Sequence, residues 1–281
     1  MSEARALPDD FAQLVTATRY QLRFFRRSYR ALAMAILMTV IAVALLAFSF
    51  YNGKAAVQAS FPDAANYMVS LLGLLTLSVT VVAAMLGGDA IATDFGSGTG
   101  YYALVLPVRR SILLLGRYLG AALIGVGVTM IYFGSVVLAA LYFFGGVPVW
   151  DTLAAFGLTI LVVLAYMAFA FLLSALFRRP VVSIVVVFLL LLIGFPIVTS
   201  VLTNFGIEPW FMIDYGANAV TQALVPLPHS TSIDRPIGMN QTVTVFSFNP
   251  TVAEGALILW GYLVASLVGS IAIYQHKEVK G

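Results

Sequence analysis

The stretch Val181–Thr203, VVSIVVVFLLLLIGFPIVTSVLT, runs for 23 residues without a charged side chain. A helix needs roughly 20 consecutive apolar residues to cross the hydrocarbon core of a bilayer, so this stretch predicts a transmembrane helix. Five further stretches without Asp, Glu, Lys, Arg or His meet the same criterion: Ala31–Phe50, Tyr67–Gly88, Tyr118–Phe144, Leu153–Phe177 and Gly255–Tyr274. We therefore predict an all-α integral membrane protein with six transmembrane helices.

The composition agrees with this class. The 281 residues are 61% hydrophobic and only 10% charged, whereas an ordinary soluble domain carries about 25% charged residues. A water-facing surface of this size cannot be covered by so few charges, which excludes a soluble enzyme, a coiled coil and a disordered chain. The chain has no cysteine, which excludes disulfides, thiolate metal sites and cysteine nucleophiles.

The distribution of Lys and Arg predicts the orientation. Thirteen of the 15 basic residues flank the spans on one side, and only Lys54 and Arg235 lie on the other, while Asp and Glu divide equally. Loops rich in Lys and Arg face the cytoplasm, so we expect a multi-pass protein of the cell membrane with both termini cytoplasmic. The basic charge then faces membrane lipids, and no nucleic-acid partner is needed to explain it.

The segment before the first span predicts an amphipathic helix. Its apolar residues recur at helical spacing and share one face, while arginines occupy much of the remainder. Such a helix would lie in the membrane interface; the alternative is a merely basic flank of the first span. We divide the chain into this segment, residues 1–30, and a membrane domain of six spans, residues 31–281. The apolar face comprises Phe11, Leu14, Leu22 and Phe25, and the basic residues include Arg19 and Arg23.

Two further features concern the fifth span and the loop after it. Gly194 and Pro196 interrupt the span, and because proline removes a backbone donor, we expect a kink or a broken helix that could line a substrate path. The long outer loop, 204–254, contains an apolar part, Trp210–Leu224, that predicts a short interfacial or re-entrant helix. Its later part, His229–Asn249, predicts irregular or strand-like structure.

Small residues recur at helical spacing in three rows: Gly116 and Gly120, Ala121 and Gly125, and Gly261, Ala265 and Gly269. Such rows let helices approach closely in lipid. We expect them to pack within one subunit; a seam between two subunits is the alternative.

Several chemistries are missing from the sequence. It has no phosphate-binding G-x-x-x-x-G-K-[ST] run, so the chain is not expected to be an enzyme that hydrolyses nucleotides. The outer loop contains Asp214, His229 and Asp234, but we interpret these as solvated loop residues and predict no metal site. The spans contain no ionisable group, which disfavours an ion-coupled transporter.

The most distinctive segment is the loop after the second span, residues 89–117, DAIATDFGSGTGYYALVLPVRRSILLLGR. It combines an acidic residue, a glycine-rich break, an apolar stretch with two tyrosines, a proline and paired arginines. This pattern predicts a short amphipathic helix between flexible joints, suited to docking in a groove of a soluble partner.

The segment resembles the loop between spans two and three in permeases of the type-2 exporter family of ABC transporters. In that family an acidic residue stands four positions before the glycine of a Gly-Thr pair, and seven residues separate this pair from a proline. An arginine follows the proline by three positions, and a Gly-Lys or Gly-Arg pair begins six positions after the arginine. The sequence matches this run without gaps and departs from it in the acid, Asp instead of Glu, and in Gly100-Tyr101-Tyr102. The matching positions are Asp94, Gly98-Thr99, Pro107, Arg110 and Gly116-Arg117.

The resemblance implies a half-transporter. Two such chains, identical or different, would form the membrane pathway as a dimer, and separate ATP-binding cassette subunits would hold the ATP and Mg²⁺, so that this chain itself needs no cofactor. The loop would be the coupling helix that contacts the ATPase, with the N-terminal helix beside it as the connecting helix. The implied contact residues are Asp94, Gly98, Thr99, Tyr101, Tyr102, Leu104, Pro107 and Arg110.

Two other functions remain open at this stage: an ATP-independent secondary transporter or channel, and a membrane anchoring or assembly protein that uses the same fold without moving a substrate. For the leading hypothesis, an interior lined by Phe, Tyr, Met, Ser and Thr suits an apolar or amphipathic substrate such as a drug-like molecule, a lipid or a peptide.

Overall fold

The computed structural model describes residues 9–93, 109–236 and 242–276. Almost all elements in this part of the chain are helical, with one short hairpin near the C-terminal helix. In chain order they are α1 (Asp10–Arg27), α2 (Tyr29–Ser60), α3 (Ala64–Leu72), α4 (Leu75–Gly87), α7 (Arg110–Phe144), α8 (Val149–Leu176), α9 (Pro180–Leu189), the π-helix η1 (Leu190–Gly194), α10 (Phe195–Asn204), α11 (Ile213–Ala217), α12 (Ala219–Leu224), β1 (Ser230–Pro236), β2 (Thr242–Phe248) and α13 (Val252–His276).

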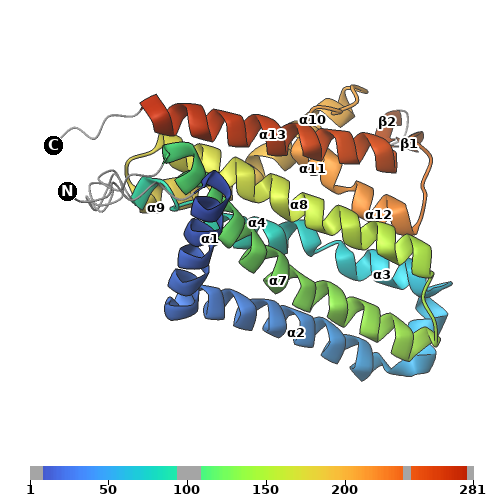
Figure 1. The fold of residues 1–281 in the computed structure, drawn as a ribbon. Helices are drawn as coiled ribbons and strands as arrows, with labels where there is room; N and C mark the ends of the chain where they lie inside the picture. The colour runs from blue at the N-terminus through green and yellow to red at the C-terminus, as the bar shows by residue number, and fades with distance from the viewer. Residues whose placement is uncertain (1–8, 94–108, 237–241, 277–281) are drawn as a thin grey trace, which may run out of the picture.

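The predicted membrane class is confirmed. Among the described residues, six helical segments are long and apolar enough to cross a bilayer: α2, α3 with α4, α7, α8, α9 through α10, and α13. They lie side by side as one bundle, and α1 lies across one end of it (Figure 1).

Helix α8 forms the centre of the bundle. It packs against α4, α7, α9, α12 and α13, and many of its buried residues are alanines, which let neighbouring helices approach closely. Larger side chains fill the remaining space, as where the rings of Tyr118 and Phe171 meet edge to face with centroids 5.5 Å apart. The Tyr118 hydroxyl also donates to the carbonyl of Leu164 at 3.0 Å. The core is therefore the interior of a helix bundle, whereas the outer faces of α2, α9, α10 and α13 are apolar and exposed.

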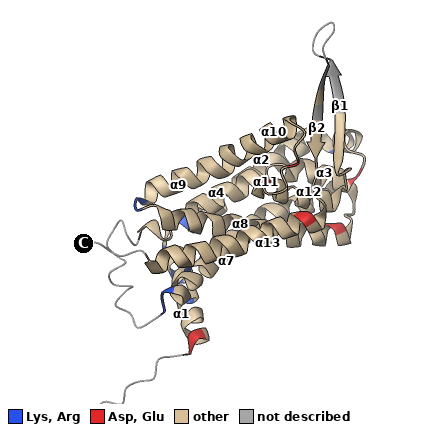
Figure 2. Cartoon of the chain, turned by 90° about the horizontal axis from the view of Figure 1, so that it is seen from above, with Lys and Arg blue, Asp and Glu red and all other residues tan. Residues whose placement is uncertain are grey.

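Charged residues lie mainly at the two ends of the bundle (Figure 2). Arginines gather where α1 ends and α9 begins, for example Arg26, Arg27 and Arg179. We call this the basic end. The opposite end carries the β1–β2 hairpin and acidic residues such as Glu254 in the first turn of α13. We call this the hairpin end.

The second span differs from its prediction as one continuous helix. It consists of α3 and α4, separated at Gly73 and Leu74. The hydroxyl of Tyr132, on α7, donates to the carbonyl of Leu71 next to this break. The backbone offers the Leu71 carbonyl a long bond, 3.4 Å from the Leu74 N–H. A weakly bonded carbonyl is costly in hydrocarbon, so the additional bond from this buried tyrosine stabilises the interruption.

Other boundaries also differ from the predicted ones. Helix α2 continues ten residues beyond the expected end at Phe50, with a non-helical glycine, Gly53, at φ 80°. Its last turns are tied to α7, because the Gln58 side-chain amide donates to the Phe143 carbonyl at 2.7 Å. Helix α7 begins at Arg110, eight residues before the predicted span. Polar residues at both span ends extend the helices beyond the apolar stretch that crosses the membrane.

The described part of the long loop contains two short helices and the hairpin. Within the apolar part Trp210–Leu224, the structure contains α11 and α12, which pack against α8 and α13. The part expected to be irregular or strand-like contains β1 and β2, paired antiparallel with Ser230 opposite Phe248 and Pro236 opposite Thr242. The hairpin rests on the end of α10, where the Phe246 ring lies over Gly206.

A glycine substitution tests the packing of α13. A Cβ at Gly255 would lie 2.3 Å from the Cβ of Ala219 on α12. We expect Gly255→Val to destabilise the protein by about 1–3 kcal/mol, as overpacking does. Gly261→Val, on the same helix with nothing within 4 Å of a Cβ, should change stability by less than about 0.5 kcal/mol. Thermal unfolding in detergent measures both, and equal losses in the two variants would contradict the packing.

Candidate functional site

The candidate site is the basic end of the bundle, where residues 94–108 connect α4 to α7. Of the predicted contact residues, Asp94, Gly98, Thr99, Tyr101, Tyr102, Leu104 and Pro107 lie outside the described residues. Arg110 is the first residue of α7. The structure describes both ends of the connection, and each is tied to other helices.

The leading end of this connection, residues 89–93 after α4, is held by a charge pair and by hydrogen bonds to a hydroxyl. The Arg30 guanidinium, at the start of α2, pairs with the carboxylate of Asp89, directly after α4. The Asp89 side chain is only 8% exposed, whereas that of Arg30 is 47% exposed. Just beyond, the backbone N–H groups of Ile91 and Ala92 both donate to the Ser174 hydroxyl on α8, each at 3.0 Å. The chain therefore leaves α4 bonded to α2 and α8.

The trailing end of the connection, at Arg109 and Arg110, contacts α1 and α13. Arg109 pairs with Asp10 in the first turn of α1 at 2.8 Å, with both side chains more than half exposed. Exposed pairs of this kind contribute little to stability. Arg110 donates a long hydrogen bond of 3.4 Å to the carbonyl of Gln275 near the end of α13. Arg109 and Arg110, where α7 begins, thus contact the first and last helices of the described chain.

Helix α1 packs closely against α7 at two glycines of α7. A Cβ at Gly116 would lie 2.4 Å from the Cβ of Ala17, and one at Gly120 would lie 2.7 Å from the Cβ of Gln21. Only glycine allows this approach, so Gly116 and Gly120, two of the small residues predicted to pack within one subunit, contact α1. Asp9 and Asp10 at the beginning of α1, and Arg26 and Arg27 at its end, complement the helix dipole.

The predicted apolar face of α1 divides between the bundle and the surface. Phe25 is 3% exposed and belongs to the core, Leu14 and Leu22 are half-buried, and Phe11 is 71% exposed. The two predicted basic residues, Arg19 and Arg23, are exposed.

The predicted interruption of the fifth span is present as the π-helix η1. The N–H of Phe195 donates to the carbonyl of Leu190 rather than to that of Leu191. Pro196 has no N–H and cannot donate to Leu192, which favours the wider turn at this point. Gly194 and Pro196 are half-buried on a segment whose other residues mostly face outward.

The hairpin end differs from what the sequence predicted. Asp214 was expected to be a solvated loop residue, but it is half-buried on α11 and accepts a hydrogen bond from the Thr199 hydroxyl at 2.9 Å. Burial raises the pKa of Asp214, and the hydrogen bond from Thr199 partly offsets this. A carboxyl group therefore lies on a loop helix that packs against the spans.

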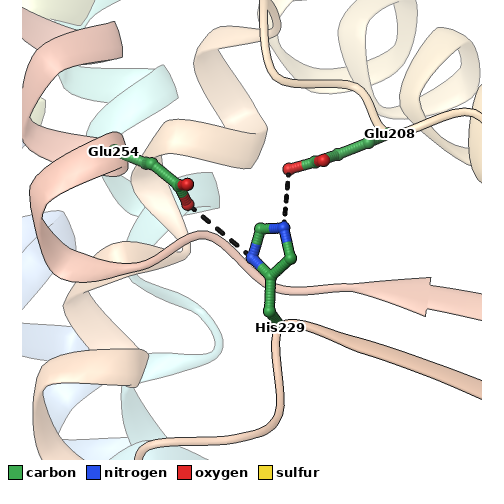
Figure 3. A group of neighbouring side chains, drawn as sticks. All are labelled: Glu208, His229 and Glu254. Atoms are coloured by element: carbon green, nitrogen blue, oxygen red, sulfur yellow. Dashed lines mark ion pairs between the residues drawn. The ribbon is translucent and has the colours of Figure 1, made fainter.

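His229 lies beside neither of the acids named with it from the sequence. Its imidazole faces Glu208, in the loop after α10, and Glu254, at the start of α13 (Figure 3). Asp234 lies in β1, four residues after the first residue of the strand, and is paired with Thr244 of β2. Within the described part of the chain, the trio Glu208, His229 and Glu254 is a set of side chains that could hold a metal ion.

Comparison with known proteins identifies the family. The family described as ABC-2 family transporter protein matches residues 54–273. A probable ABC transporter permease protein NosY from Stutzerimonas stutzeri is 26% identical over 289 aligned positions, which cover 94% of this chain and 99% of that protein. A protein of the same name from Pseudomonas aeruginosa is 33% identical over 142 positions, half of each chain. Together with the six membrane helices, these matches place the chain in the ABC-2 transporter family, as a permease subunit.

Proposed function

We propose that the chain is the membrane half of an ATP-driven exporter, coupled to a separate ATP-binding cassette subunit through residues 94–108. ATP and Mg²⁺ would bind in that partner, and this chain would catalyse nothing. The observation that carries the proposal is the attachment of both ends of the coupling segment to several helices of the bundle. A displacement of the segment would therefore reach α1, α2, α8 and α13 directly.

The attachments explain how a docking event could move the spans. Arg30 and Ser174 hold the leading end to α2 and α8, and Arg109 reaches α1 at the trailing end. ATP binding would bring the ATPase subunits together and favour one arrangement of the bundle over another by differential contact. Hydrolysis would then return the bundle to its first arrangement.

A dimer of permease chains would supply the pathway. The exposed apolar faces of α2, α9, α10 and α13 can contact lipid or a second chain, which is identical or different. The interruption at Gly194 and Pro196 lies on one of these faces, so we place it beside the pathway. Its neighbours include an aromatic group in which Phe195 meets Phe169 at 5.3 Å and Tyr262 at 6.3 Å. Such a lining suits an apolar or amphipathic substrate.

The charge distribution supports an orientation in which the basic end lies on the cytoplasmic side of the cell membrane. The ATPase would then meet the basic end, and the hairpin would face outward. Helix α1 would lie at the cytoplasmic interface, where its exposed arginines can contact lipid headgroups.

The coupling segment is tested by removing its two tyrosines. We expect Tyr101→Ala/Tyr102→Ala to reduce co-purification of the ATPase subunit at least tenfold, because paired aromatic side chains are typical anchors of an interface. The measurement is a gentle detergent purification of the tagged chain from its native membrane, followed by quantitative mass spectrometry of any subunit with a phosphate-binding loop. The purified variant should unfold at the same temperature as the wild type.

Tyr51→Ala is the matched control, since Tyr51 is 90% exposed on α2 near the opposite end. It should leave co-purification unchanged. Equal recovery of the ATPase with the double variant would contradict the coupling assignment. If no ATPase accompanied even the wild type after cross-linking with ATP bound, the secondary-transporter and anchoring functions would be favoured.

A further inference from the structure

Three side chains from separate segments meet at the hairpin end (Figure 3). The His229 Nε2 atom lies 3.3 Å from a carboxylate oxygen of Glu208, and its Nδ1 atom lies 3.7 Å from one of Glu254. One ligand atom from each of the three residues can be chosen so that all lie within 4.8 Å of one another. The side chains are between about one third and one half exposed, so an ion from solvent can reach them.

Local structure positions each of the three residues. Glu254 belongs to a capping box at the start of α13: the Thr251 N–H donates to the Glu254 carboxylate at 2.8 Å, and the Glu254 N–H donates to the Thr251 hydroxyl at 3.3 Å. Asn249 fixes the base of the hairpin, because its N–H donates to the His229 carbonyl at 2.8 Å. Glu208 accepts a hydrogen bond from the Tyr215 hydroxyl at 2.7 Å.

The ligand set selects the kind of ion. An imidazole with two carboxylates is a donor set for zinc and related divalent transition cations, whereas Ca²⁺ and Mg²⁺ prefer oxygen ligands alone. With metal–ligand bonds of about 2.0–2.2 Å, tetrahedral ligands are about 3.3–3.6 Å apart. One ligand atom from each of the three residues lies within 4.8 Å of the others, so rotations of the side chains would bring them to this spacing. Hydrogen bonds from Tyr215 and from the Thr251 N–H orient the two carboxylates, as outer-shell partners do in metal sites.

We propose that Glu208, His229 and Glu254 bind one divalent transition cation of the zinc type, with a further coordination position open to water or to a ligand from a partner. The imidazole must turn so that a single nitrogen meets the ion together with both carboxylates. The bound ion would join the loop after α10, the base of β1 and the start of α13, and so fix the hairpin on the bundle. This site is independent of the ATP-driven cycle proposed above.

The experiment is titration of Zn²⁺ into the full chain, purified in detergent with a histidine-free affinity tag and stripped of metal, in competition with a zinc-sensitive dye. We expect one site per chain, with binding reduced at least 100-fold in His229→Ala and in Glu208→Gln/Glu254→Gln. His276→Ala is the matched control, because it removes the other histidine of the chain, which is exposed at the basic end of α13. It should bind as the wild type does. Millimolar Mg²⁺ or Ca²⁺ should not displace the zinc.

Tyr215→Phe is a second test that keeps all three ligands. Losing its hydrogen bond to Glu208 should weaken zinc binding by about 10–100-fold, the usual effect of an outer-shell change. Tyr215→Phe therefore tests the site even if His229→Ala fails to fold. No zinc binding by the wild type, or equal binding by the wild type and His229→Ala, would overturn the proposal.

Discussion

Gly116→Leu is expected to separate α1 from α7 and to uncouple the ATPase from the membrane helices. Even a Cβ at this position would lie 2.4 Å from the Cβ of Ala17, and 3.2 Å from the backbone nitrogen of Thr18. A leucine cannot be accommodated by side-chain movement alone, because the opposing atoms belong to a short side chain and to backbone. The helix must shift as a whole or detach, at a cost of about 1–3 kcal/mol or more.

Limited trypsin digestion measures the detachment, since Arg19 and Arg23 are exposed on α1 but cleavage requires local unfolding of the helix. We expect cleavage in α1 to become at least tenfold faster in Gly116→Leu. Gly127→Leu and Gly134→Leu are matched controls on the same helix, because nothing lies within 4 Å of a Cβ at either position. Equal cleavage of all three variants would show that the close approach at Gly116 does not hold α1.

The membrane helices could be predicted well because span formation depends on local composition. Each apolar stretch corresponds to a membrane-crossing segment, and the N-terminal periodicity to α1. The break between α3 and α4 could not be predicted in this way. A single glycine such as Gly73 is common in membrane helices, and the interruption depends on a hydroxyl from Tyr132, about 60 residues further along the chain.

The sequence also indicated the coupling segment but not what holds its ends. Arg30 and Asp89 are each visible as charges at a span edge on the same predicted side, so their pairing could have been suspected from the topology. Ser174 could not, because one serine at a span end carries no signal for its partner. Its role follows from where α8 passes relative to the residues after α4.

At the hairpin end, sequence proximity gave the wrong partners for His229. Asp214 and Asp234 were the acids considered with it, but the hairpin and the two short helices bring Glu208 and Glu254 to the imidazole instead. Glu254 carried a local signal, the Thr-x-x-Glu capping pattern at Thr251. Which loops meet at the end of a bundle depends on tertiary packing, and no local pattern records it.

Arg30→Gln is expected to destabilise the protein by about 2 kcal/mol and to block the ATP-driven change in the spans. Removing the guanidinium leaves the Asp89 carboxylate, only 8% exposed, without its cation. Loss of one partner from a fully buried pair costs about 3–5 kcal/mol, and the half-exposed arginine reduces that figure. The double variant Arg30→Gln/Asp89→Asn removes the stranded charge and should recover at least half of the lost stability. A double-mutant cycle from thermal unfolding gives the interaction energy.

The functional effect can be followed with a single cysteine, since the chain has none of its own. Ile197→Cys places a thiol beside the interruption of the fifth span, at a position that is 56% exposed. In complex with the ATPase, ATP should change the rate at which a maleimide labels this thiol, and Arg30→Gln should abolish the change while the ATPase still co-purifies. Arg109→Gln is the matched control, because the Arg109–Asp10 pair is exposed on both sides and its loss should cost less than about 1 kcal/mol. If Arg30→Gln kept the full response to ATP, movement would reach the spans without passing through Asp89, and Ser174 would be the remaining link at the leading end.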